Sequence, residues 1–179
     1  TEGFDDFARR GVLFERAYAP APITLPSHAT MLTGVYPPEH GLRVNGIGRL
    51  DRRLPVLTET LKRNGYDTAA FLAAVVLDSK FGLDRGFDLY DDDLSAARPG
   101  DHHGERRRDG QEVMDAALAW LTGRSGRPFF CWVHLYDAHA EYDPRPDIYG
   151  TAFADRPYDA GVAEQARQLA RLSSFLQEH

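Results

Sequence analysis

The spacing of apolar residues along the chain switches repeatedly between the period of a helix and the period of a strand. Apolar positions three or four residues apart predict helices at 2–10, 26–32, 56–64, 105–121 and 159–178. Alternating or continuously apolar runs predict strands at 12–19, 68–76 and 129–135. The stretches 81–104 and 136–158 are rich in Asp, Gly and Pro, and we predict them to be loops.

The order of these elements predicts the fold class. Strands that alternate with helices indicate an α/β fold, in which a mostly parallel sheet is flanked by helices. Three strands are few for such a sheet, and the first residues already read as the middle of a domain. We therefore expect residues 1–179 to form a single, partial domain. No run is long and apolar enough to be a transmembrane segment.

Charge and cysteine content narrow the functional classes. The formal net charge is -6, which argues against a nucleic-acid partner, because such proteins normally present a basic face. The single cysteine, Cys131, lies in an apolar run and cannot form an internal disulfide. We predict it to be a small core residue, so a hydrolase that uses its thiol is the weakest hypothesis.

Thr24 is the first residue that suggests chemistry. It lies between a predicted strand and a short predicted helix that begins near Pro26. The N-terminus of a helix offers unpaired N–H groups that can hold a phosphate or sulfate while a hydroxyl attacks it. A threonine hydroxyl needs a base or a metal ion to do so. The residues alone leave a second interpretation open, in which Thr24 is only the helix N-cap.

The longer sequence around Thr24 resembles the sulfatase signature. In that signature a Cys or Ser, converted to formylglycine, precedes x-P-S-R, and the motif ends in L-T-G; here residues 23–34 read ITLPSHATMLTG. Further segments occur in the order and at the spacing of that family, at 7–22, 36–46, 57–71, 81–93 and 128–144. The resemblance covers most of residues 4–145. It implies part of an alkaline-phosphatase-like sandwich, and a sulfatase-like catalytic domain.

Two departures from the signature bear on the mechanism. Thr24 stands where sulfatases carry the formylglycine precursor, and His28 stands where they carry an arginine. Members of the wider alkaline-phosphatase superfamily use an unmodified threonine as a metal-bound nucleophile. The resemblance therefore implies a hydrolase or transferase that acts on sulfate or phosphate esters through Thr24, with Ser27 and His28 beside the substrate.

Three further residues are candidates for the same site. By resemblance, His139 matches the histidine that contacts the ester or its leaving group, which makes it a general acid. His134 is placed beside the substrate, although a hydrogen-bonded histidine at the end of a strand is the simpler interpretation. Asn45 lies in a turn that could line the pocket, or it serves only the turn. A separate metal site of His134, Asp137 and His139 is conceivable but weakly indicated.

The resemblance also implies a divalent metal ion, which could be calcium, magnesium, manganese or zinc, with Thr24 as one ligand. The other ligands of the family, an acidic pair and a D-H-G-E motif, are expected before Thr1 and beyond His179. Residues 101–105 read DHHGE but follow no apolar strand, so we interpret them as a coincidence in a loop.

These inferences leave two functions open. The first is a metal-dependent enzyme acting on a small-molecule, glycan or lipid ester of sulfate or phosphate. The alternative is a truncated or degenerate, non-catalytic segment of such an enzyme. Because the family is often exported or membrane-attached, the resemblance also implies a periplasmic or membrane-associated location.

Overall fold

The computed structural model describes residues 2–95, 107–124 and 126–179, and the DHHGE segment lies outside them. Its helices are α1 (Glu2–Arg10), α2 (Thr24–Thr33), α3 (Pro37–His40), α4 (Leu57–Arg63), α5 (Gly110–Thr122), α6 (Pro146–Tyr149) and α7 (Pro157–Glu178). Two short 3-10 turns, η1 (Val75–Leu77) and η2 (Ser79–Phe81), follow the first strand. No helix in the described part of the chain is long and apolar enough to cross a bilayer.

The sheet has three parallel strands in the order β2 (Leu89–Asp91), β1 (Asp67–Leu72), β3 (Phe129–His134). In the central strand β1, every residue after Asp67 is buried, as the apolar run predicts for a strand covered on both faces. The parallel α/β fold predicted from the sequence is confirmed, and β3 forms one edge of the described sheet.

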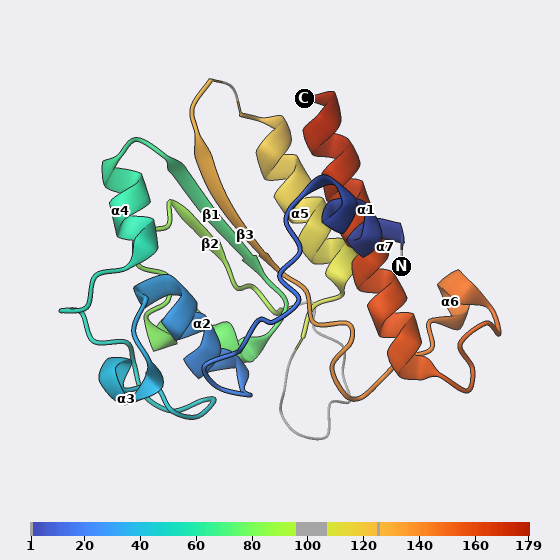
Figure 1. The fold of residues 1–179 in the computed structure, drawn as a ribbon, viewed down its shortest axis with the longest axis horizontal. Helices are drawn as coiled ribbons and strands as arrows, with labels where there is room; N and C mark the ends of the chain where they lie inside the picture. The colour runs from blue at the N-terminus through green and yellow to red at the C-terminus, as the bar shows by residue number, and fades with distance from the viewer. Residues whose placement is uncertain (1, 96–106, 125) are drawn as a thin grey trace.

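Helices cover both faces of this sheet (Figure 1), with α2 and α4 on one side of the strands and α5 and α7 on the other. Strand residues alternate between the two sides. Phe71 of β1 points toward α5 and meets Trp120 edge to face, with ring centroids 6.2 Å apart. Trp132 of β3 points to the opposite side and stacks on His28 of α2. The side of β3 that carries Trp132 and His134 therefore faces the candidate nucleophile helix.

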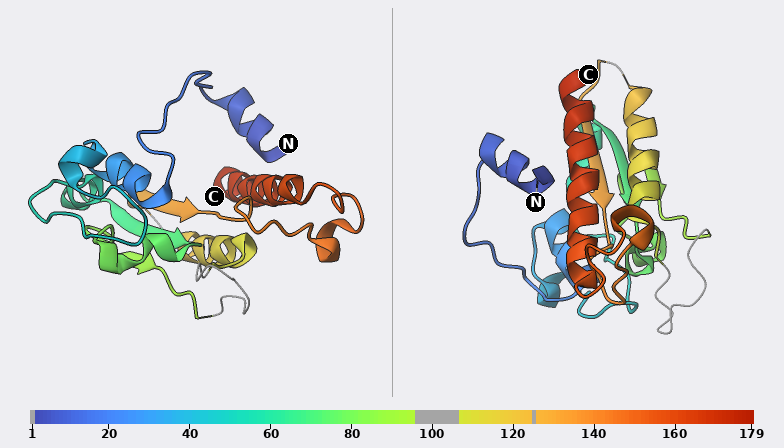
Figure 2. Two further views of the ribbon diagram at one scale, coloured as in Figure 1. Left: turned by 90° about the horizontal axis from the view of Figure 1, so that it is seen from below. Right: turned by 90° about the vertical axis from the view of Figure 1, so that its right-hand side faces the viewer.

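Helix α1 lies across α7, in front of the sheet layers (Figure 2). The two backbones approach closely at Gly3, where a Cβ atom would lie 2.9 Å from the carbonyl carbon of Ala166. Any larger residue at position 3 would push the helices apart. The α1–α7 pair is joined to the rest of the molecule by the linker 11–22 and by the packing of α7 on α5.

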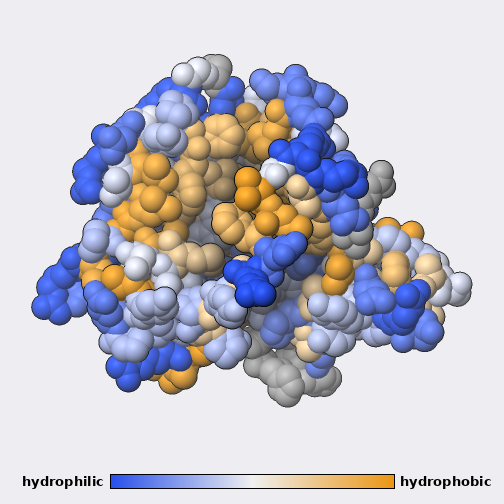
Figure 3. All heavy atoms as spheres, in the orientation of Figure 1, coloured by the Kyte–Doolittle hydropathy of each residue, from blue (hydrophilic) through white to orange (hydrophobic). Residues whose placement is uncertain are grey.

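The strand predicted at 12–19 is wrong. Residues 11–22 form an irregular linker, because no strand in the described part of the sheet pairs with them. Its large apolar side chains are exposed, at 81% for Val12, 68% for Leu13, 77% for Phe14 and 87% for Tyr18. Figure 3, in the orientation of Figure 1, shows apolar residues gathered over the strands and the linker in front of them.

Strand β2 was not predicted, because it lies inside the predicted loop 81–104. It has only three residues, which is too short to reveal a period of two. Other boundaries differ by a few residues. The run predicted as a strand at 68–76 ends at Leu72, because the chain then turns into η1, and α2 and α7 each begin two residues before the predicted start.

Candidate active site

Helix α2 presents Thr24 as its first residue. The preceding Ile23 is extended, with φ -136° and ψ 151°, and occupies the N-cap position. Thr24 is therefore not the cap, contrary to the simpler interpretation of its sequence. Leu25, Pro26, Ala29 and Leu32 are buried against the core, so Thr24 and His28 are left half-buried on the same face, one turn apart.

The first amides of α2 are mostly engaged within the protein. Asn45 Oδ1 accepts a hydrogen bond of 2.8 Å from the Leu25 N–H. Pro26 has no N–H, and the N–H of Ser27 donates to the Ile23 carbonyl at 3.3 Å. The expectation that a helix starting near Pro26 offers its amides to an ester is therefore corrected: the helix starts earlier, and Asn45 holds its end in place.

His28 lies between the helix and β3. Its Nδ1 donates to the Thr24 carbonyl at 2.8 Å, which leaves the Nε2 lone pair as an acceptor. The ring stacks on Trp132 with centroids 5.3 Å apart and planes at 24°. Burial lowers the pKa of His28, while its hydrogen bond to Thr24 opposes that effect. The imidazole is therefore neutral near pH 7.

His134, the last residue of β3, contacts His28 edge to face at 5.1 Å. Burial lowers its pKa to about 3, and the neighbouring His28 adds to the shift. Its buried Nδ1 has no hydrogen-bond partner among the described residues. The sequence-based interpretation of His134 as a hydrogen-bonded histidine therefore does not hold for this nitrogen, which is left with unused capacity beside the site.

Two more rings extend this contact to His139. His134 meets Tyr136 with centroids 5.6 Å apart, and Tyr136 stacks on His139 at 4.2 Å with planes at 14°. We call His28, His134, Tyr136 and His139 the ring row. It connects the nucleophile helix with the loop after β3, and His139 at its far end is exposed. The structure thus brings three histidines predicted from the sequence into one continuous contact.

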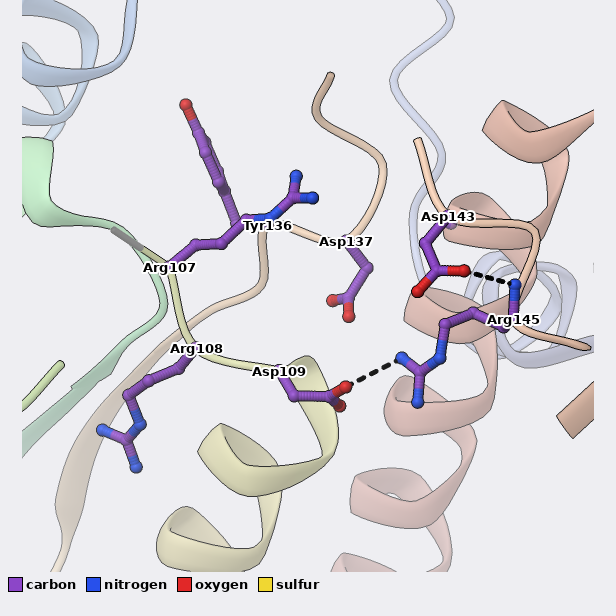
Figure 4. A pocket seen from close by; sticks show the side chains of 8 residues that line it. Arg107, Arg108, Asp109, Tyr136, Asp137, Asp143 and Arg145 are labelled. Atoms are coloured by element: carbon purple, nitrogen blue, oxygen red, sulfur yellow. Dashed lines mark hydrogen bonds and ion pairs between the residues drawn. The ribbon is translucent and has the colours of Figure 1, made fainter. Parts of the chain in front are cut away.

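The loop that carries His139 is held by charged residues that the sequence did not single out (Figure 4). Arg107 donates to the carbonyls of His139 at 3.2 Å and Glu141 at 2.7 Å. Arg145, only 9% exposed, pairs with Asp109 at 2.9 Å. Asp109 also caps α5 by accepting from the Gln111 N–H at 3.0 Å. An Asp before a helical pattern signals such a cap, but nothing in the sequence indicates its pairing with Arg145.

Asp137 lies between these groups, above a cavity of about 40 Å³, large enough for a water molecule. Its Oδ1 accepts from the Gly110 N–H at 3.0 Å, and its buried Oδ2 has no hydrogen-bond partner in the described part of the chain. Burial raises the pKa of Asp137, and the charge of Asp109 raises it further. A Cβ at Gly110 would collide with this carboxylate, so a larger residue there would displace the Asp137 side chain.

The described residues do not assemble a metal site. They contain no cluster of three or more His, Cys, Asp or Glu side chains that could hold an ion. The arrangement of His134, Asp137 and His139 considered from the sequence is therefore not formed as a metal site. Nor is Cys131 reactive, because burial raises the pKa of its thiol to about 11.

Comparison with known proteins decides the family. A family model described as sulfatase matches residues 1–177. The chain belongs to the sulfatase family. Sulfatases generally use a divalent metal ion, and the departures at Thr24 and His28 are therefore departures within the family.

Two curated sulfatases of Bacteroides thetaiotaomicron are similar to this chain. An N-acetylglucosamine-6-O-sulfatase is 26% identical over 160 residues, which cover 84% of this chain and 28% of that protein. A Delta 4,5-hexuronate-2-O-sulfatase is 34% identical over 71 residues, which cover 37% of this chain and 15% of that protein. The chain thus spans less than a third of either relative.

The fold is shared with solved structures. One, of a protein in complex with k-i-k-neocarrahexaose, superposes with a TM-score of 0.77 at 20% identity. The alignment covers 98% of this chain and 49% of that chain. The parallel sheet flanked by helices therefore corresponds to about half of that longer chain.

Proposed function

We propose that this chain supplies the nucleophile and part of the substrate-facing wall of a sulfatase-family enzyme that hydrolyses sulfate esters of glycans. The observation that carries the proposal is the ring row, which places the helix of Thr24 and His28 against the strand and loop of His134 and His139. On this view, residues 1–179 form one part of a single catalytic domain. The sulfatases named above support a sulfated sugar as the substrate.

The proposed roles follow from position and protonation. Thr24 Oγ1 attacks the sulfur, and its proton passes to His28, a neutral imidazole one helical turn away. The S–O bond to the sugar breaks, and His139 donates a proton to the departing oxygen, which leaves a sulfate ester on Thr24. Water then attacks the sulfur and gives a proton to His139, the bond to Thr24 Oγ1 breaks, and the proton on His28 returns to Oγ1 as inorganic sulfate is released. Ser27 and His134 lie beside the ester, and Asn45 acts through the helix end that it holds.

In this proposal the metal ion needs ligands in addition to the residues that the structure describes. A divalent ion would supply charge stabilisation for the ester. Among the described residues, Thr24 is the proposed metal ligand. Since these residues form no ligand cluster, the other ligands would lie outside them.

A phosphate ester is the second candidate substrate. The observation that favours it is Thr24 itself, because a threonine cannot be converted into the aldehyde of formylglycine. An unmodified hydroxyl also suffices for phosphoryl transfer in the wider superfamily that the sequence resembles.

The test is release of inorganic sulfate or phosphate by the purified protein, with divalent metal ions added, from N-acetylglucosamine-6-O-sulfate and N-acetylglucosamine-6-phosphate. We expect sulfate release, and a loss of at least about 10³-fold in Thr24→Ala. Thr151→Ala, in an exposed turn, is the matched control. His28→Gln should cost about 100-fold if the imidazole accepts the proton. Release of phosphate alone would favour the second candidate, and release of neither would favour a non-catalytic segment.

A further inference from the structure

A second pocket, of about 450 Å³, is lined by the end of the linker 11–22 and by the segment that contains α3. Its walls are four prolines, Ala21, Tyr36 and Arg43. We call it the proline pocket. Pockets that bind small organic ligands are typically of this size and are mostly apolar with a few polar groups. The volume therefore fits one sugar unit.

The proline pocket adjoins the candidate nucleophile along the chain. Pro22, in its wall, precedes Thr24 by two residues, a span of at most about 7 Å. Arg43, also in the wall, belongs to the same turn as Asn45, which holds the N-terminus of α2. Two lining segments of the pocket are therefore connected to the start of the helix that carries Thr24.

Hydrogen bonds hold the part of the pocket wall that α3 supplies. His40, 2% exposed, ends the short helix that contains Pro37 and Pro38. Its Nδ1 accepts from the Leu42 N–H at 3.2 Å, so its Nε2 donates to Thr30 Oγ1 at 3.0 Å. These bonds lock α3 and the following turn onto α2. This part of the wall is thus formed before any ligand arrives, which lowers the entropic cost of binding.

Two side chains of the pocket, those of Tyr36 and Arg43, are exposed and accessible to a ligand. Tyr36 is 68% exposed, and Arg43 is also exposed. Arg43 makes no hydrogen bond or ion pair with any residue that the structure describes, whereas Arg85 pairs with Glu59 and Arg145 with Asp109. A free guanidinium binds sulfate or carboxylate through two parallel hydrogen bonds, and a tyrosine ring offers a flat apolar face.

We propose that the proline pocket binds the sugar unit next to the one that carries the ester, and that this neighbouring unit bears a carboxylate or sulfate paired with Arg43. The inference rests on the proposed function, since it takes Thr24 as the reacting residue. The apolar walls and Tyr36 receive the ring of the sugar, while Arg43 selects its charge. An uncharged partner would gain nothing from Arg43.

The experiment measures binding without turnover, by calorimetry in a Thr24→Ala background. The probes are two disaccharides of N-acetylglucosamine-6-O-sulfate, one linked to a hexuronate and the other to galactose. We expect the hexuronate probe to bind about tenfold more tightly, the Arg43→Gln variant to lose that preference, and Tyr36→Ala to weaken both probes about fivefold. Arg52→Gln, another exposed arginine, should change nothing.

A preference that survives Arg43→Gln, or no binding of either probe, would overturn the inference. A separate assay keeps it distinct from the proposed function. The monosaccharide N-acetylglucosamine-6-O-sulfate lacks the neighbouring unit, so its hydrolysis should be equal in the native protein and in Arg43→Gln. If the native protein does not hydrolyse it while the disaccharide preference holds, the proposed function fails and the carbohydrate site stands.

Discussion

His134 meets His28 edge to face, with ring centroids 5.1 Å apart and planes at 79°. The contact joins the last residue of β3 to the second turn of α2. Burial lowers the pKa of both imidazoles, so the pair is uncharged near pH 7. Two protonated rings at this distance would repel one another, and each would have to be charged inside the protein.

The stability of the fold should therefore fall in mild acid. In the folded chain the pKa of both histidines lies below the unfolded value of 6.5, so the unfolded chain binds protons first. The stabilisation is complete above pH 6.5 and is lost as the pH falls toward about 3. Each such proton contributes a slope of about 1.4 kcal/mol per pH unit.

Urea unfolding between pH 7.5 and pH 5 measures this slope. The His134→Gln variant should show a slope smaller by up to one proton than the native chain. A free energy of unfolding that rises as the pH falls through this window would contradict the assignment of neutral histidines.

Asn45 should stabilise the start of α2 through its side-chain oxygen. Asn45→Ala removes the acceptor for the Leu25 N–H and should cost about 1 kcal/mol of unfolding free energy. Asn45→Asp keeps an acceptor and places a negative charge at the helix N-terminus, so it should retain the stability. Thermal melts of both variants make the comparison, and equal losses would show that the hydrogen bond is not the cause.

The pair of Arg145 and Asp109 should hold the His139 loop. The two side chains are 10% and 14% exposed and lie 2.9 Å apart. Asp109→Asn keeps the helix cap but removes the buried charge that faces the guanidinium, at an expected cost of about 3 kcal/mol. Asp147, which lies 3.6 Å from the same guanidinium but is 65% exposed, is the matched control.

Asp147→Asn should leave the urea midpoint almost unchanged, because exposed pairs contribute little. If the two asparagine variants lose the same free energy of unfolding, the buried pair of Arg145 and Asp109 stabilises the fold no more than the exposed pair does.

The purified chain of residues 1–179 should retain no stoichiometric divalent metal after dialysis. The physical reason is that its described residues form no cluster of ligands. Elemental analysis beside a Thr24→Ala control measures this directly. One equivalent of metal that disappears in the control would show that a site assembles around Thr24 after all.

The fold could be predicted where a segment is long and its burial is one-sided or complete. The apolar stripe of α7 and the continuous run of β1 are such cases. The strand predicted at 12–19 was wrong because alternating apolar residues form a strand only where another strand pairs with them. Strand β2 was not predicted because three residues are too few to show an alternation of apolar and polar positions.

The candidate site was predicted in part, through motifs that place residue types at a spacing. Thr24 and His28 follow from their signature, and His134 and His139 from theirs. The sequence could not predict the ring row itself, because the contact with α2 depends on which side of β3 each residue faces. The pairing of Arg145 with Asp109 could not be predicted either, since the two residues lie far apart in the sequence and no motif links them.

The open edge of β3 and the exposed apolar linker have a consequence for the chain in solution. Unpaired strand edges are templates for pairing with another copy, and the exposed side chains of Val12, Leu13, Phe14 and Tyr18 add apolar surface that can associate. The net charge of -6 keeps copies apart only at long range, and at 0.1 M salt it is screened beyond about 10 Å. Aggregation of this chain should therefore increase with ionic strength, so its colloidal stability is greatest in dilute buffer.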